Sequence, residues 1–249
     1  MDIKKVYEDG QVTKYLVKGV SIGFMNSLRR TITNNVPCLA VEEVTIYAND
    51  SVIFDEMLAN RLGLLPIKTD LKSYKQGDTV KLILEKEGPG MVTSKDIKCT
   101  DPKIEIIDKK VYITKLGKED KIKIEMKAIM DVGRGHAKHQ SAIIAYHEVA
   151  SINNEKTHKN IKELMEELPK GAVESKAGKL FLMDPYNIKF QNHPVNILEK
   201  HGVYLDYSNN EFVLTIETTG QLTREEIIKT ALDNLNLKLE DFKKEVQKL

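Results

Sequence analysis

The residue types most able to do chemistry gather between Gly133 and His147. The run Gly133-Arg134-Gly135-His136 is rich in glycine, and His136, His139 and His147 carry imidazoles that could bind zinc. The glycines have neither the spacing of a P-loop that ends in Gly-Lys-Ser/Thr nor a complete GxGxxG motif. No other cluster of metal-binding residue types lies nearby in the sequence. We therefore expect no phosphate-binding loop, and we expect surface or interface histidines rather than zinc ligands.

Acidic, serine and cysteine residues do not suggest a catalytic set. The carboxylate pairs Glu42-Glu43, Asp55-Glu56 and Glu166-Glu167 have structural interpretations as strand ends, helix caps and solvated faces, because no histidine or serine pattern accompanies them. No serine stands in a GxSxG motif. The two cysteines, Cys38 and Cys99, can form neither a disulfide framework nor a CxxC metal knuckle. The sequence predicts no active site within this chain.

Composition restricts the classes of function further. Of 249 residues, 41% are hydrophobic and 30% are charged, which is typical of a folded protein with a core of ordinary size. Because 38 basic and 37 acidic residues leave a net charge of +1, no global basic field exists to hold nucleic acid. We expect no direct sequence-specific binding of nucleic acid. Since no apolar stretch approaches the roughly 20 residues of a membrane span and no signal peptide is evident, we expect a cytoplasmic protein.

The elements that must position any functional residues follow from periodicity and turn signals. In the first half of the chain, Ser21 is the expected cap of the first helix and Asp55 that of a short second helix, which ends at Gly63. The predicted elements are a hairpin over 1–20, a helix over 21–35, a strand at Val41–Tyr47, a helix at Asp55–Leu62, and strands at Val80–Leu84, Ile104–Ile107, Val111–Ile113 and Ile122–Met126. Residues 68–130 are therefore expected to form a β-rich block.

The second half changes character. Residues 150–203 predict a small α+β insert with helices near Asn160–Leu168 and Val195–Lys200 around a hairpin at Ala172–Leu182. A strand at Glu211–Glu217 follows, and the capping box that starts at Thr223 begins a long helix.

That long helix carries the clearest physical signal. Its apolar residues recur at alternating spacings of four and three, at Ile228, Leu232, Leu235, Leu239, Phe242, Val246 and Leu249. Such a stripe marks a helix face that is buried against an apolar surface. Two structures fit it, a helix that lies on its own sheet or a helix shared with a second chain, and the extension of the stripe to the last residue favours a partner.

Four segments resemble the α-like subunits of multisubunit RNA polymerases. The first, Phe24–Val44, contains Asn-Ser-Leu-Arg-Arg, which is similar to the first-helix signature of that family. Asp55–Ile67 resembles the DE-x-x-x-x-RLG-hydrophobic-Pro stretch of the archaeal and eukaryotic branch, Gly133–Gln140 resembles its G-x-G-H-A-K element, and Phe212–Leu235 resembles the closing strand and helix. Residues 68–130 match only by position. The likeness is greatest to the archaeal D subunits, the third-largest-subunit family of the DNA-directed RNA polymerase.

The resemblance implies an α+β fold with a discontinuous α-like dimerisation domain (residues 1–41 and 204–249), an inserted β-rich domain (42–156) and a small ferredoxin-like α+β insert (157–203). It also implies a function in transcription, as a non-catalytic subunit of the DNA-directed RNA polymerase, a nucleotidyltransferase complex. The implied partners are the α-like subunit L, the large catalytic subunits and small assembly subunits. The catalytic NADFDGD motif of the largest subunit has no counterpart in this sequence.

Specific residues take roles from this resemblance and from their spacing. We expect the interface with subunit L, here called the L seam, to contain residues of both the first and the last helix: Phe24, Leu28, Ile32, Ile228, Leu232 and Leu235. Arg29 and Arg30 are adjacent, so at about 100° per residue they cannot both point into that seam. The family implies that Arg29, Arg30 and Arg61 contact the second-largest subunit.

Many archaeal D subunits carry iron–sulfur clusters in a ferredoxin-like domain, and residues 157–201 resemble its outline without its ligands. The cysteine positions of two ferredoxin runs hold His158, Ile161, Leu164 and Leu168, then Ile188, Gln191, Pro194 and Leu198. The zinc-binding cysteines of some eukaryotic counterparts are absent too. We therefore expect no cofactor and a small apolar core instead. Two alternatives remain, a free-standing homodimeric transcription regulator on the same fold and a ferredoxin-like electron carrier.

Overall fold

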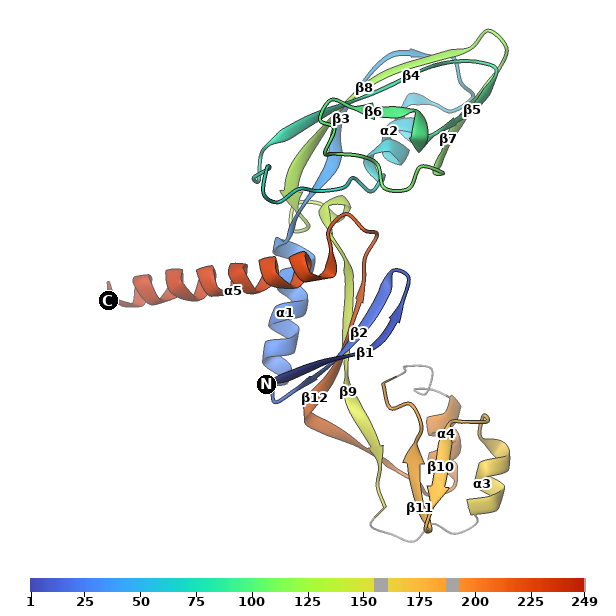
Figure 1. Cartoon of the computed structure of the whole chain (residues 1–249), viewed down its shortest axis with the longest axis vertical. Helices are drawn as coiled ribbons and strands as arrows, with labels where there is room; N and C mark the ends of the chain where they lie inside the picture. Colours follow the sequence, from blue (N-terminus) through green and yellow to red (C-terminus); the bar gives the residue numbers. More distant parts are fainter. Residues whose placement is uncertain (155–160, 187–192, 249) are drawn as a thin grey trace. The chain divides into compact units, whose positions relative to one another are not determined.

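The protein is described by a computed structural model that covers residues 1–154, 161–186 and 193–248 (Figure 1). These residues form an α+β fold, as predicted. They divide into two compact units, one with Met1–Asn26 and Ala145–Thr215, the other with Ser27–Ile144 and Ile216–Leu249. Each unit thus combines segments far apart in the sequence, as expected for a discontinuous fold. The expected domain limits at 41, 156 and 203 divide the chain differently and remain a prediction.

The first unit is built on a four-stranded sheet in the order β1-β2-β12-β9. Its strands are β1 (Asp2–Asp9), β2 (Val12–Lys18), β9 (Ile143–Ile152) and β12 (Leu205–Glu217). The predicted hairpin is confirmed, since β1 and β2 pair antiparallel and Gly10 in the turn has a φ of 52°, which favours glycine. Tyr146 on β9 meets Phe212 on β12 edge to face, with ring centroids 6.0 Å apart. The two ends of the chain therefore contribute to one sheet.

The same unit contains the small α+β insert, and its elements agree with the prediction. They are α3 (Ile161–Glu167), β10 (Val173–Lys176), β11 (Lys179–Leu182) and α4 (His193–Lys200). Leu164, Leu168 and Leu198 belong to a buried apolar core, against which Ile161 packs. Apolar contacts therefore hold the two helices to the hairpin. Ile161 and the three leucines stand at positions where a ferredoxin run has cysteines. His158, Ile188 and Gln191 lie outside the described residues, as does the side chain of Pro194.

The second unit contains the β-rich block. Its elements are β3 (Pro37–Asn49), α2 (Asp55–Gly63), β4 (Thr79–Glu87), β5 (Gly90–Thr93), η1 (Ser94–Asp96), β6 (Ile97–Cys99), β7 (Tyr112–Leu116), β8 (Lys121–Val132) and η2 (Ala137–His139). One sheet has the order β3-β8-β4-β6, and β5 pairs with β7. Alternate residues of β4 and β8 are buried, while Lys81 and Glu125 pair at 2.5 Å on the exposed face. This alternation is typical of an antiparallel sheet with one solvated face.

Two local predictions in this block are wrong. Phe54, not Asp55, is the N-cap residue of α2, and it makes no side-chain capping bond. The carboxylate of Asp55 lies in the first turn and accepts a hydrogen bond from Asn49 Nδ2 at 2.7 Å. Ile104–Ile107 forms no strand, because its backbone pairs with residues 66–68 only around the single bridge between Ile67 and Ile106.

Two helices complete the chain, α1 (Ile22–Asn35) and α5 (Arg224–Val246). Both predicted caps are confirmed. The amide of Phe24 donates to Ser21 Oγ at 3.2 Å, and the amide of Glu226 donates to Thr223 Oγ1 at 3.2 Å while the Glu226 carboxylate accepts from the Thr223 amide. Each cap satisfies backbone donors that a helix N-terminus leaves without partners. No helix in the described part of the chain is long and apolar enough to cross a membrane.

Candidate functional site

The apolar stripe of α5 is out of phase with the side of the helix that packs inside the chain. Ile227 and Ala231 are fully buried, and Asn234 Nδ2 donates to the carbonyl oxygen of Asn35 at 2.8 Å. These inward positions precede Ile228, Leu232 and Leu235 by one residue each, which is about 100° around a helix. The stripe therefore lies on a different face of α5 from the one that packs against the rest of the chain.

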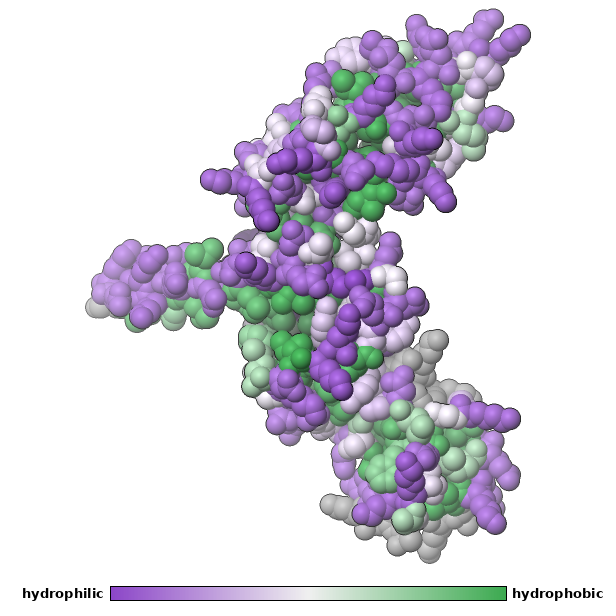
Figure 2. Space-filling model, in the orientation of Figure 1, coloured by the Kyte–Doolittle hydropathy of each residue, from purple (hydrophilic) through white to green (hydrophobic). Residues whose placement is uncertain are grey.

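The α5 stripe is defined as Ile228, Leu232, Leu235, Leu239, Phe242 and Val246, and its C-terminal half is more exposed than its first half. Ile228 and Leu235 are half-buried, whereas Leu232 is 37% exposed. The exposed fraction reaches 65% at Leu239 and 70% at Phe242, and Figure 2 shows apolar surface interrupting the hydrophilic surface of this helix. Leu249, the last position of the predicted stripe, lies outside the described residues. Large exposed apolar surfaces of this kind are typical of interaction sites.

The seam residues expected on α1 differ from those on α5. Leu28 and Ile32 are buried within this chain, and Phe24 is half-buried. Ile32 in particular has no exposed surface. The predicted L seam therefore consists of exposed or half-exposed positions on α5 and mostly covered positions on α1.

The three arginines expected to contact a large subunit have three different environments. Arg29 is half-buried and Arg30 is exposed on α1. Arg61 Nη1 donates to the carbonyl oxygen of Ile113 at 2.9 Å, and the guanidinium lies over the ring of Tyr112, 6.0 Å from its centroid. The contacts of Arg61 therefore tie α2 to β7 within this chain.

An apolar surface next to Arg61 was missed by the sequence analysis. Phe54, Met57 and Leu64 are exposed around α2, whereas Leu58 and Leu62 on the same helix are fully buried. The signal was present in the sequence, because a short helix that carries apolar residues outside its buried phase has a second apolar face.

The glycine-rich element, residues 133–140, lies against the C-terminal end of α1. A Cβ atom added at Gly133 would lie 2.1 Å from the carbonyl oxygen of Thr33, so only glycine permits this approach. The amide of Arg134 donates to the carbonyl oxygen of Asn34 at 3.1 Å. This bond satisfies one of the acceptors that a helix C-terminus leaves free. The glycine therefore serves packing of the backbone.

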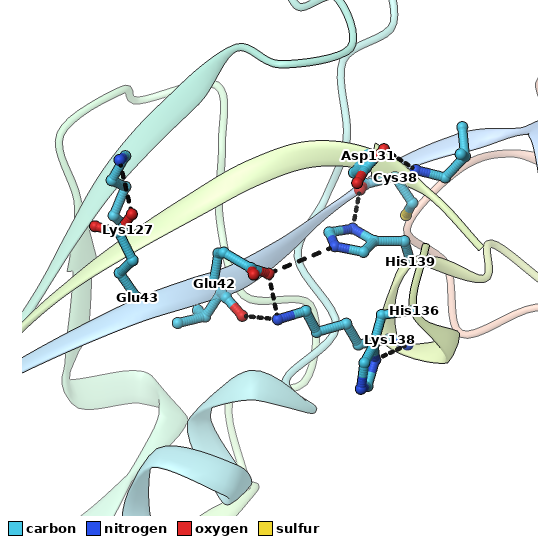
Figure 3. A network of polar contacts seen from close by, with 10 residues as sticks. Cys38, Glu42, Glu43, Lys127, Asp131, His136, Lys138 and His139 are labelled. Carbon is cyan, nitrogen blue, oxygen red and sulfur yellow. Dashed lines mark hydrogen bonds and ion pairs between the residues drawn. The ribbon is translucent and has the colours of Figure 1, made fainter. Parts of the chain in front are cut away.

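A network of polar contacts fixes the other end of this element to β3 (Figure 3). Lys138 Nζ donates to the carbonyl oxygen of Val41 at 2.9 Å and lies 2.5 Å from Glu42 Oε2. Glu42 occupies a β-bulge, since the pairing with β8 shifts between Val41 and Glu43, and a bulge redirects a side chain. The hydrogen bond from Lys138 lowers the pKa of Glu42. The carboxylate pair at Glu42-Glu43 thus lies in the middle of a strand, not at the strand end proposed from the sequence.

The expectation of surface or interface histidines is wrong for His139. This side chain is buried, and its Nδ1 donates to the carbonyl oxygen of Cys38 at 2.9 Å, which leaves Nε2 at 4.0 Å from Glu42 Oε2. His136 is exposed, and its Nδ1 accepts a hydrogen bond from the amide of Lys138 at 3.1 Å. In the described ranges no group of three or more His, Cys, Asp or Glu side chains could hold a metal ion. The histidines instead shape and anchor the loop.

Two further chemical candidates are His147 and the buried thiol of Cys38. Burial lowers the pKa of His147 on β9, and the nearby Lys14 lowers it further. Burial raises the pKa of the Cys38 thiol to about 11, with a hydrogen-bonding contact to Thr69 Oγ1 at 3.4 Å. A thiol with so high a pKa is a poor nucleophile, because the thiolate is the reactive form.

Comparison with known proteins decides the family. Residues 44–168 match the family described as the RNA polymerase Rpb3/RpoA insert domain. The DNA-directed RNA polymerase subunit Rpo3 of Pyrococcus furiosus is 35% identical over 248 residues, which cover 95% of this chain and 93% of that protein. The chain belongs to the archaeal Rpo3 family. Rpo3 is the D subunit, so the resemblance seen in the sequence is confirmed.

Other members of the family are similar to this chain over nearly its whole length. The Rpo3 subunit of Thermococcus kodakarensis is 35% identical over 251 residues, with 95% of this chain and 94% of that protein covered. The Rpo3 subunit of Halobacterium salinarum is 29% identical over 247 residues, with 99% and 97% covered. Neither a free-standing regulator nor a ferredoxin-like electron carrier is supported by these relatives.

Proposed function

We propose that this chain is a non-catalytic subunit of an archaeal DNA-directed RNA polymerase, and that it assembles with the other polymerase subunits in transcription. It pairs with the α-like subunit L and forms a platform for the large catalytic subunits. The site of action is the cytoplasm. Membership of the Rpo3 family supports the general role, and the α5 stripe is the observation that supports the dimerisation.

The geometry of α5 favours a partner chain over packing on the chain's own sheet. The inward side of the helix is already occupied at Ile227 and Ala231, while Leu239 and Phe242 remain exposed about 100° away. A partner helix with a matching stripe would bury these side chains, and each large apolar side chain that is fully buried contributes about 1.5–3 kcal/mol. A heterodimer with L along the α5 stripe follows, in which Leu28 and Ile32 support α1 from within.

The large subunits are proposed to dock on α1 and on the surface around α2. Arg30 is exposed on α1, and Phe54, Met57 and Leu64 form an exposed apolar patch beside Arg61. Because Arg61 already contacts Ile113 and Tyr112, we assign it the role of positioning α2 for this contact. Arg29 and Arg30 retain the contact role expected from the sequence.

The experiment that tests dimerisation uses two leucines on opposite sides of α5. Leu237 is 57% exposed and lies about 180° around the helix from the centre of the stripe. In co-expression with subunit L, Leu232→Asp should abolish the heterodimer on size-exclusion chromatography, because an unpaired carboxylate is costly to bury. Leu237→Asp is the matched control and should leave it intact. An intact Leu232→Asp heterodimer, or a stable homodimer of this chain alone, would contradict the proposal.

We also propose that the small α+β insert holds no iron–sulfur cluster. Cys38 and Cys99 are the two cysteines of the chain, and neither lies in the insert. The apolar core around Leu164, Leu168 and Leu198 supports a purely structural role. Metal analysis of anaerobically purified protein should find no stoichiometric iron, and a visible charge-transfer band would contradict this part of the proposal.

A further inference from the structure

Cationic residues from distant segments are attached to the C-terminal end of α1, which itself carries Arg30. Arg30 lies one helical turn before Asn34 and therefore on the same side of α1. The carbonyl oxygen of Asn34 accepts a hydrogen bond from the amide of Arg134 at 3.1 Å, so the loop that carries Arg134 is attached at this point. Lys238 of α5 donates to Asn35 Oδ1 at 3.1 Å, which adds a third cation at the same helix end.

Neither arginine is neutralised within the described part of the chain. Arg30 and Arg134 are both exposed, and neither guanidinium makes a hydrogen bond or ion pair with a described residue. The carboxylates of the loop network have other partners. Glu42 is paired with Lys138. Asp131 Oδ1 accepts from two uncharged donors, Gln76 Nε2 and the Val132 amide, both at 2.8 Å, so this carboxylate keeps its charge but is hydrogen-bonded to groups other than the arginines. The guanidinium donors of Arg30 and Arg134 are therefore available to a partner.

The loop is also held in place before any partner arrives. Lys138 and His139 attach it to β3 through the carbonyl oxygens of Val41 and Cys38, and Gly133 allows its close approach to Thr33. A surface that is already ordered loses less conformational entropy on binding than a free loop. Residues 134–137 are exposed between these attachment points.

We propose that Arg30 and Arg134 form one docking site for an acidic segment of a large polymerase subunit. This inference rests on the proposed function and adds Arg134, on a different segment, to the contact expected of Arg30. The planar guanidinium group binds carboxylates through two parallel hydrogen bonds, which makes arginine pairs well suited to Asp and Glu side chains. A nucleic-acid backbone is the weaker fit, because a net charge of +1 supplies no extended field for binding phosphates.

The experiment uses the heterodimer of this chain with subunit L and measures its affinity for the large subunits over a series of salt concentrations. The variants are Arg134→Glu and Arg134→Lys, and Lys118→Glu on an exposed loop of the β-rich block is the control with the same change of charge. Because the Arg134 backbone amide is retained, its bond to Asn34 persists in each variant. Arg134→Glu should weaken binding about tenfold or more at low salt and reduce the salt dependence. Arg134→Lys should lie between Arg134→Glu and the unchanged protein.

Four outcomes are distinguished. Weakened binding by Arg134→Glu with unchanged binding by Lys118→Glu supports the site. Equal effects of the two variants, whether large or absent, overturn it. If Arg134→Glu loses binding to a 30-base-pair DNA duplex but keeps its affinity for the large subunits, the site is overturned in favour of a nucleic-acid contact. If the unchanged heterodimer forms but does not bind the large subunits, the platform role and this site are both wrong, whereas the dimerisation stands.

Discussion

Helices α1 and α5 both carry apolar stripes, yet the structure uses them differently. On α1, Leu28 and Ile32 are covered by this chain, and Ile32 has no exposed surface. On α5, the stripe from Leu232 to Val246 remains largely exposed, while a second row that includes Ile227 and Ala231 packs inward. An apolar stripe therefore shows that a helix needs an apolar neighbour, and packing decides whether that neighbour belongs to the same chain.

The largest expected effect on stability comes from truncating a side chain of the buried stripe on α1. Ile32→Ala should lower the free energy of unfolding of the isolated chain by about 2–5 kcal/mol, because it removes buried methyl groups and leaves a cavity. Leu239→Ala, a comparable truncation on the exposed stripe, should change it by about 0.5 kcal/mol or less. Urea unfolding, together with amide exchange along α1, would measure both. Equal losses would mean that the two stripes have the same environment.

Truncation of the exposed stripe should act on association instead. Phe242→Ala should weaken the heterodimer with subunit L about 30-fold, since a buried aromatic anchor contributes about 2 kcal/mol to an interface. The stability of the isolated chain should remain unchanged. Isothermal titration calorimetry gives the affinity, and an unaffected heterodimer would place Phe242 outside the interface.

A smaller effect is expected where the two helices meet. Asn234→Ala removes the hydrogen bond from Asn234 Nδ2 to the carbonyl oxygen of Asn35 and should cost about 1 kcal/mol of stability. Asn236→Ala, an exposed asparagine two residues later, is the matched control and should have almost no effect. Faster amide exchange at the end of α1 in the first variant alone is the expected result. Identical exchange in both would show that this bond does not hold α1.

The smallest effect concerns pH and the loop that caps α1. The pKa of Glu42 is lowered by the hydrogen bond from Lys138, so the folded state binds this proton less readily than the unfolded state. The contribution to stability is therefore present above the ordinary glutamate pKa and is lost as pH falls through the lowered value. Since Glu42 is half-exposed, the loss should be a few tenths of a kcal/mol.

The matched variants are Glu42→Gln and Glu43→Gln. Glu42→Gln should remove the acid-induced change in the NMR signals of Lys138 and His139. Glu43 pairs with Lys127 on the neighbouring strand, so Glu43→Gln should leave that change in place. A change that persists in Glu42→Gln would mean that another group titrates.

Much of the local structure could be predicted because it depends on short segments. The Ser21 and Thr223 caps, the turn at Gly10 and the long C-terminal helix follow from residues close in sequence. The predictions that failed have a physical cause. Ile104 and Ile106 are buried and alternate as in a strand, but their backbone forms only one bridge, which sequence alternation cannot reveal. The apolar residue types at Phe54, Met57 and Leu64 were visible in the sequence, but the patch was missed because their exposure depends on the tertiary structure.

The sequence by itself determined the elements of this α+β chain, its stripes and its resemblance to polymerase subunits, since these depend on residue type and spacing. Tertiary structure decided that Ile32 is covered while Phe242 is exposed, and that His139 is buried. It also placed Gly133 against Thr33, which is a hundred residues earlier in the chain. The physical reason is that burial and close backbone approach are set by contacts between distant segments, and periodicity within one segment cannot report which neighbour is present.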